Sequence, residues 1–162
     1  MNHPSLLGTP TTASLTLREV LTRMGSKHSP RIDLDDVHVL RHVYRPGGHE
    51  EMQKPEDLTD PEKLLAYTSS QHFSALKFTA TPPTYWVIFI ADGGRRARLF
   101  GTFENRGELP VQPGATRRFF DLRPSSFLAP LAGTLVIDWD NPRSWQRRAD
   151  RVADRPVLEF RA

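Results

Sequence analysis

The chain has 162 residues, a formal net charge of +3 and no cysteine. Without cysteine, disulfides, thiolate catalysis and cysteine-ligated zinc are excluded. No long apolar run and no basic-then-apolar leader pattern occur, so we expect a soluble, cytoplasmic protein that does not enter a membrane. The length and a hydrophobic content of 38% suit a globular domain with a substantial core. We expect residues 1–15 to form a flexible N-terminal segment and residues 16–162 to form one domain.

Charge is distributed unevenly along the chain. Residues 1–91 hold 9 basic and 10 acidic side chains, whereas residues 92–162 hold 13 arginines against 9 acidic side chains. Codon bias in a GC-rich genome would explain part of an arginine total of 18 against 4 lysines, but it does not explain the asymmetry. Because arginine makes bidentate and stacking contacts with phosphates and bases, the second half of the chain suggests a nucleic-acid surface.

The first half predicts two helices and one strand. Thr16 has the character of an N-cap, apolar residues follow at helical spacing, and Gly25 is expected to end that helix. The β-branched residues of 37–44 predict a strand whose two faces both mix polar with apolar side chains, so it is expected to run from the core into a site or an edge. Asp60 or Thr59 is expected to cap a second helix that ends near residue 71.

Residues 85–105 predict a β-hairpin around which the domain is organised. Residues 86–90 form an apolar run, and Asp92-Gly93-Gly94 suits a tight turn because glycine tolerates positive φ. Alternation in the return strand predicts one apolar face and one face bearing arginine beside an aromatic ring. The apolar face is expected to comprise Ala97, Leu99, Gly101 and Phe103.

The remaining residues predict shorter elements. Residues 117–122, 134–139 and 156–160 have strand character, a short helix is expected between about residues 125 and 133, and Asn141 is expected to cap a basic helical turn. Together the elements predict an α+β domain of five or six strands. Its sheet is expected to be mixed, mostly antiparallel, and either curved or an open barrel of the PUA or B3 kind, with short flanking helices.

The sequence lacks the usual catalytic patterns. No lysine is preceded two residues earlier by an acid, as the common restriction-nuclease motif requires, and no phosphate-binding loop or nucleophile elbow occurs. Asp138 and Asp140 have the chemistry to hold a divalent ion, but a polar strand end is the preferred interpretation. His38 and His42 would lie about 13 Å apart on a strand, too far to share one ion. We therefore expect no catalysis, no metal and no cofactor.

The order of several segments resembles the N-terminal, non-catalytic domain of bacterial GIY-YIG nuclease-family proteins. The segments are VHVLRH (37–42), EKLLAYTSSQ (62–71), YWVIFIADGGRRARLFGTFEN (85–105), RFFDL (118–122), LVIDW (135–139) and SWQRRADRVADRPVLEF (144–160). The resemblance implies a DNA-recognition or regulatory module of a restriction-type protein, which either stands alone or belongs to a longer protein with a C-terminal nuclease domain; the nuclease motif itself does not occur in this sequence. By analogy with small barrels beside nucleases, a modified base is a candidate target.

Basic and aromatic residues are the candidates for nucleic-acid binding. The alternative is that the exposed arginines are merely solvated, and an RNA-binding or protein-docking module of barrel type without catalytic activity is the rival function. Trp145 lies amid charges and is the preferred base-stacking residue, whereas core packing is favoured for Trp86 and Trp139. The predicted DNA-binding residues are Arg41, His42, Arg45, Tyr67, Gln71, Arg95, Arg96, Arg98, Arg117, Arg118, Trp145, Arg147 and Arg148.

Overall fold

The computed structural model describes residues 15–47, 52–72, 83–139, 146–148 and 154–160. Within these residues, two α-helices accompany one sheet of eight strands, more strands than the sequence predicts. The helices are α1 (Leu17–Lys27) and α2 (Pro61–Ser69). The strands are β1 (Val37–His42), β2 (Ser70–His72), β3 (Tyr85–Ala91), β4 (Arg96–Leu109), β5 (Arg117–Ser125), β6 (Val136–Asp138), β7 (Gln146–Arg148) and β8 (Val157–Glu159). The predicted flexible segment lies, except for Leu15, outside the described residues.

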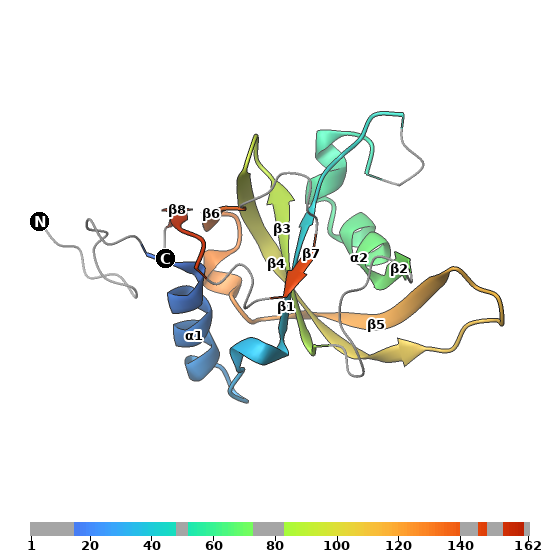
Figure 1. Cartoon of the computed structure of the whole chain (residues 1–162), viewed down its shortest axis with the longest axis horizontal. Helices are drawn as coiled ribbons and strands as arrows, with labels where there is room; N and C mark the ends of the chain where they lie inside the picture. The colour runs from blue at the N-terminus through green and yellow to red at the C-terminus, as the bar shows by residue number, and fades with distance from the viewer. Residues whose placement is uncertain (1–14, 48–51, 73–82, 140–145, 149–153, 161–162) are drawn as a thin grey trace, which may run out of the picture.

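The sheet is mixed and curved, as predicted, and it is not closed into a barrel (Figure 1). Its strand order is β2-β5-β4-β3-β1-β7, while β6 pairs with the first residues of β4 and carries β8. Among the strand pairs that the structure describes, only β1–β3 is parallel, with Val37 beside Tyr85 and His42 beside Ile90. Because parallel neighbours need a crossover, the chain between β1 and β3 is long, and it contributes helix α2 and the edge strand β2.

Helix α1 begins as the sequence predicts but does not end at its glycine. Thr16 and Glu19 form a reciprocal capping box, and the helix continues to Lys27. Gly25 lies inside the helix, where a side chain's first carbon would approach the Ile32 carbonyl oxygen to 2.3 Å. The glycine is therefore needed for a close approach of two backbone segments rather than for termination.

The two helices cover opposite faces of the sheet (Figure 1). Leu17, Val20 and Leu21 of α1 pack in one cluster with alternate residues of β1, β3 and β4. Leu65 of α2 packs against the other cluster, which contains Leu40 and Trp86. Burial on both faces explains why β3 is a nearly continuous apolar run, whereas β1 is buried along its whole length although it contains His38, Arg41 and His42.

A β-bulge changes the predicted faces of the return strand β4. Phe89 pairs with Leu99 but Ile88 pairs with Gly101, so Phe100 is the extra residue. Leu99 consequently packs in the cluster beneath α1, whereas Phe103 packs with Trp86 in the cluster beneath α2. The prediction that Ala97, Leu99, Gly101 and Phe103 share one face is wrong, because strand alternation reverses across a bulge.

Several predicted elements change type or length. Strand β5 extends to Ser125, so the predicted helix after it reduces to a single 3-10 turn, Ala129–Leu131. Helix α2 ends at Ser69, because the next three residues pair with β5 as strand β2. The predicted basic helical turn is wrong for Gln146–Arg148, which pairs antiparallel with β1 as β7. Its remaining residues lie outside the described part.

Candidate nucleic-acid interface

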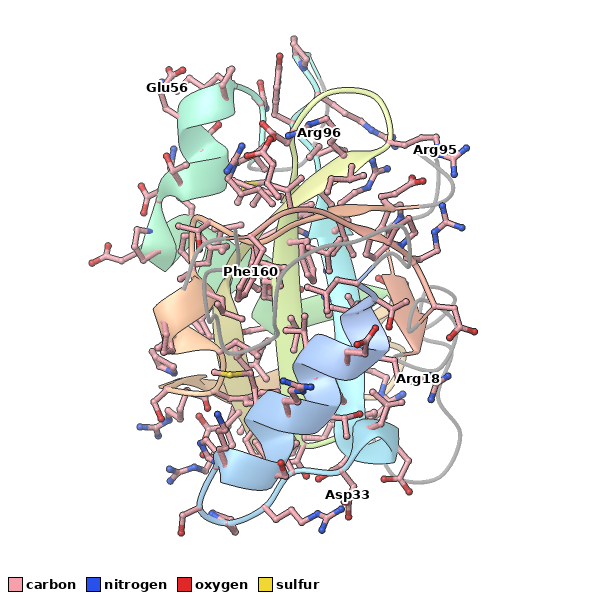
Figure 2. The ribbon with its side chains drawn as sticks, turned by 90° about the vertical axis from the view of Figure 1, so that its left-hand side faces the viewer. Arg18, Asp33, Glu56, Arg95, Arg96 and Phe160 are labelled. Atoms are coloured by element: carbon pink, nitrogen blue, oxygen red, sulfur yellow. The ribbon has the colours of Figure 1, made fainter. Side chains whose placement is uncertain are left out.

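The turn between β3 and β4 places three predicted arginines at one end of the sheet. Gly93 and Gly94 take φ values of +88° and +55°, in the region that suits glycine. The Asp92 backbone N–H donates to the Arg96 carbonyl, and the Arg96 N–H donates to the Gly93 carbonyl, both at 2.9 Å. The sequence prediction of a tight Asp-Gly-Gly turn is thereby confirmed, and Arg95 extends outward from it (Figure 2).

Arg95 makes a bidentate ion pair with Asp138 of β6. Its Nε and Nη2 donate to the two carboxylate oxygens at 3.0 and 3.1 Å. Arg155 donates to the same carboxylate at 2.6 Å and to the Asp138 carbonyl at 3.2 Å. One carboxylate therefore orients two guanidinium groups from segments far apart in the chain, and the contact with Arg95 is of the fork type that arginine favours.

Arg96 and Arg98 of β4 form a second set of ion pairs, with Asp92 at the β3–β4 turn and Glu159 in β8. Arg98 donates to Asp92 at 2.8 Å and to the Gly133 carbonyl at 3.0 Å. Arg96 donates to Glu159 of β8, and its Nε lies 3.7 Å from Asp92. We call the complete set the arginine corner. It comprises Asp92, Arg95, Arg96, Arg98, Asp138, Arg155 and Glu159.

The arginine corner carries one net positive charge and is open to solvent. Its four arginines face three carboxylates, and the side-chain exposure falls from 53% for Arg95 to 25% for Arg155. Half-exposed ion pairs of this kind contribute little stability, since water screens them. The carboxylates hold the guanidinium groups in place, and the outward N–H donors remain accessible to an incoming anion.

Two predicted site residues of β1 lie in the interior instead, and the first is Arg41. Arg41 is 2% exposed, and its guanidinium carbon lies 5.7 Å from the ring centre of Trp139. Burial lowers the pKa of Arg41 below its ordinary value. Trp139 and Trp86 are themselves fully buried, as the core-packing interpretation predicts. Arg41 thus lacks the exposure that direct phosphate contact requires in this structure.

The second is His42, which meets Tyr67 at the contact between β1 and α2. The His42 Nε2 lies 2.9 Å from the Thr68 hydroxyl, and the His42 ring meets the Tyr67 ring edge-to-face at 5.0 Å. His42 is 2% exposed, and burial lowers its pKa from 6.5 to about 4. The imidazole is consequently neutral at pH 7 and joins the helix to the sheet.

Gln71, Arg117 and Arg118 come together across the β2–β5 pair. Gln71 stands opposite Arg118, is 3% exposed, and donates to the Thr68 carbonyl at 2.7 Å. Arg117 donates to the hydroxyl and carbonyl of Ser70. Arg118 makes a bidentate pair with Glu108 at 2.6 and 2.7 Å, which lowers the pKa of that carboxyl group and raises the pKa of Arg118.

The last four predicted residues are described only in part. Arg45 is exposed after the end of β1, and its backbone N–H donates to the Met52 carbonyl. Arg147 and Arg148 lie in β7, opposite Val39 and His38 of β1. Trp145 lies outside the described residues, so its proposed stacking role stays a prediction.

The predicted arginines do not form one continuous group. Arg96 begins β4, whereas Arg118 binds Glu108 near the other end of this 14-residue strand. Figure 1 shows the consequence: the outer part of the β4–β5 hairpin, residues 105–122, which we call the β4–β5 arm, leaves the body of the sheet in a different direction from the β3–β4 turn. The predicted residues that the arginine corner brings together are Arg95, Arg96 and Arg98.

Four members of the arginine corner are absent from the predicted binding set. They are Asp92, Asp138, Arg155 and Glu159. Asp138 follows Arg95 by 43 residues, and Glu159 follows Arg96 by 63, so local spacing gives no sign of either pair. The available signal was the place of each acid at the end of a short apolar strand, VID in β6 and VLE in β8. Asp138 serves there as an arginine partner at a strand end, in line with the preferred interpretation of that residue.

The described residues contain neither a group of three or more His, Asp or Glu side chains placed to share a metal ion nor a helix with the length and apolarity to cross a membrane. No model of a protein family, no curated protein and no solved structure matches this chain. The resemblance to a domain of GIY-YIG nuclease-family proteins therefore stays a prediction. The structure defines an α+β protein with an open, curved sheet and an arginine-rich corner.

Proposed function

We propose that this protein binds duplex DNA through the arginine corner and carries out recognition rather than catalysis. The observation that carries the proposal is the convergence of four oriented, solvent-accessible arginines from the β3–β4 turn, β4 and the segment before β8. Phosphate oxygens accept the same bidentate hydrogen bonds as the carboxylates now in place. The arginine excess of residues 92–162 supports this role, because phosphate neutralisation supplies most of the affinity of such modules.

The proposal extends to the biological setting predicted from the sequence. In a restriction-type defence protein, a recognition module of this kind would act beside a nuclease domain on a partner segment or chain. A modified base is a candidate target, which the duplexes in the experiment below are chosen to reveal. Location in the cytoplasm belongs to the same proposal.

Replacing Arg95 and Arg96 together by glutamine is expected to weaken DNA binding and flatten its salt dependence. Each lost phosphate contact should reduce the slope of log K against log salt by about one, so the double variant should reduce it by about two. The fold should persist, because Asp138 keeps Arg155, and both Asp92 and Glu159 keep Arg98 within 4.0 Å. Binding would be measured by fluorescence anisotropy across a salt series, with unmodified, base-methylated, hydroxymethylated and phosphorothioate duplexes.

Arg106→Gln is the matched control for this experiment. Arg106 is as exposed as Arg95, with 58% of its side chain accessible, and it pairs with Glu104 outside the corner. The control variant should bind DNA with unchanged affinity and slope. Absence of binding to every duplex at low salt would refute the proposal, as would equal weakening by the control.

Protein docking is the second candidate function, and the β4–β5 arm favours it. Leu109 and Phe119 stand opposite each other on the arm, with exposed fractions of 48% and 40%, and Val111, two residues after Leu109 in the chain, is 38% exposed. Exposed apolar groups gathered on a projecting hairpin are typical of contact surfaces. An RNA-binding role shares the chemistry of the arginine corner and is distinguished by competition with structured RNA.

Substitution of both Leu109 and Phe119 by serine is expected to abolish any self-association of the chain while leaving DNA binding intact. Both side chains already face solvent, so the free energy of unfolding should change by no more than about 0.5 kcal/mol. Sedimentation velocity across a concentration series measures the association. Wild-type protein that stays monomeric throughout would argue against a second copy as the partner of the arm.

A further inference from the structure

A hollow of about 400 Å³ lies beside the arginine corner. It is lined by Arg98, Gly133, Thr134, Glu159 and Phe160. Its volume falls at the lower end of the range for small-ligand sites, about 300–1,000 Å³. Glu159 ends strand β8 and Phe160 follows it, on the side of the molecule that carries α1 (Figure 1) and that faces the viewer in Figure 2.

One wall of the hollow is a fixed hydrogen-bond donor. Arg98 has five N–H groups, and its hydrogen bonds to Asp92 and Gly133 use Nη2 and Nη1. These two contacts come from different segments, so they determine the orientation of the guanidinium plane before any ligand arrives. A donor oriented in advance loses little conformational freedom on binding.

A second wall consists of the Glu159 carboxylate, which accepts hydrogen bonds, and the apolar ring of Phe160 next to it. Glu159 directs one carboxylate oxygen to Arg96, while its Oε1 lies 4.0 Å from Arg98 Nη2, beyond hydrogen-bond distance. The Glu159 side chain is 50% exposed, so both oxygens retain lone pairs for a ligand. Phe160 packs against the core cluster beneath α1 and stays partly exposed. It supplies a firm apolar surface of the kind that planar rings contact.

We propose that this hollow binds a guanine base. Guanine presents a carbonyl oxygen next to two adjacent N–H donors on its Watson–Crick edge. The carbonyl would accept from Arg98, the two donors would meet the Glu159 carboxylate, and the ring would lie against Phe160. Cytosine and adenine offer one amino donor on that edge, and thymine offers a single N–H between two carbonyls, so none matches the carboxylate in two places.

The inference rests on the proposed DNA-binding function, because the site would receive a base taken out of the stack next to phosphates held by the corner. Enzymes and readers that handle flipped bases read the Watson–Crick edge with hydrogen bonds and an apolar ring contact. The other three arginines of the arginine corner, Arg95, Arg96 and Arg155, lie beside the hollow and are placed to hold the backbone of such a nucleotide.

The test compares 5′-monophosphates of guanosine, inosine, adenosine, cytidine and uridine by isothermal titration calorimetry. All five share the phosphate, so their ranking isolates the base. Guanosine monophosphate is expected to bind about tenfold or more tightly than the others, as a well-made bidentate contact implies. Inosine lacks the 2-amino group, so its weaker affinity tests the second hydrogen bond to the carboxylate. Equal affinities, or no binding, would overturn the proposal without any variant.

Glu159→Gln should remove the preference for guanosine, because an amide accepts at only one atom. Glu104→Gln is the matched control, since Glu104 pairs with Arg106 at 3.5 Å and lines no part of the hollow. Retained preference in Glu159→Gln would also overturn the proposal. DNA binding without guanine preference would reject this site and leave the proposed function standing. Guanine preference without DNA binding would support the site and reject the proposed function.

Discussion

Between pH 6.5 and pH 4, His42 is expected to lower the stability of the folded protein progressively, by about 3 kcal/mol in total. Burial holds the pKa of His42 near 4 in the folded state, against 6.5 when it is exposed. As pH falls through 6.5, His42 takes up a proton in the unfolded chain but stays neutral in the folded chain. The stability linked to His42 is thus complete above about pH 6.5 and declines progressively down to about pH 4, at roughly 1.4 kcal/mol per unit of pKa difference.

Urea unfolding from pH 7.5 to pH 4 would measure this effect in the wild type and in two variants. His42→Gln removes the titrating group, so its pH dependence should be shallower than that of the wild type by about 3 kcal/mol over this range. Thr68→Val removes the hydrogen-bond partner at 2.9 Å but leaves the ring buried. It should be less stable by about 1 kcal/mol at every pH while keeping the wild-type slope. Parallel curves for wild type and His42→Gln would contradict the assignment.

Gly25→Ala is expected to destabilise the protein by about 2–3 kcal/mol, although alanine is the better helix former. Helix propensity alone would favour alanine by about 1 kcal/mol. The added carbon would lie 2.3 Å from the Ile32 carbonyl oxygen, which belongs to the backbone and cannot rotate away. The Ile32 N–H also donates to the Gly25 carbonyl at 3.0 Å, so separating the two segments stretches a hydrogen bond. Overpacking of this kind commonly costs about 1–3 kcal/mol or more.

Gly101→Ala is the control for that substitution. Gly101 lies in β4, has no positive φ, and has open space around the position of an added carbon. Its free energy of unfolding should stay within about 0.5 kcal/mol of the wild type. Unfolding midpoints in urea would measure both variants. If Gly25→Ala matched or exceeded the stability of the wild type, the close approach of Gly25 to Ile32 would not restrain this helix.

Local patterns were sufficient for most element types in the first two-thirds of the chain. Thr16 and Asp60 act as the helix caps that their residue types predict, and Asp92-Gly93-Gly94 forms the predicted turn. These features depend on contacts within four residues, so the sequence around each position contains the whole cause. Predictions failed where a longer-range contact competes with local preference, as in β7, whose residues have helical character but complete the sheet beside β1.

In the candidate site, too, the sequence predicted what depends on neighbouring residues and missed what depends on distant ones. The sequence identified Arg95, Arg96 and Arg98 because they are adjacent in one strand and its turn. Their partners Asp138 and Glu159 are 43 and 63 residues away from Arg95 and Arg96 in the chain, and only the pairing of β4 with β6 and of β6 with β8 brings them close. Residue type did not reveal burial either. Arg41 and His42 are of types that usually lie at the surface, but both lie in the interior.

By itself, then, the sequence determined the α+β class, the central hairpin, both helix caps and the arginine excess of the second half. These follow from composition, alternation and turn chemistry, which act over a few residues. The tertiary structure alone decided which arginines come together in the arginine corner, which carboxylates orient them and that the sheet stays open. It also decided which residues of β4 pack beneath α1 and which pack beneath α2. Those outcomes depend on strand pairing between distant segments and on one bulge, where a single extra residue exchanges the two faces of a strand.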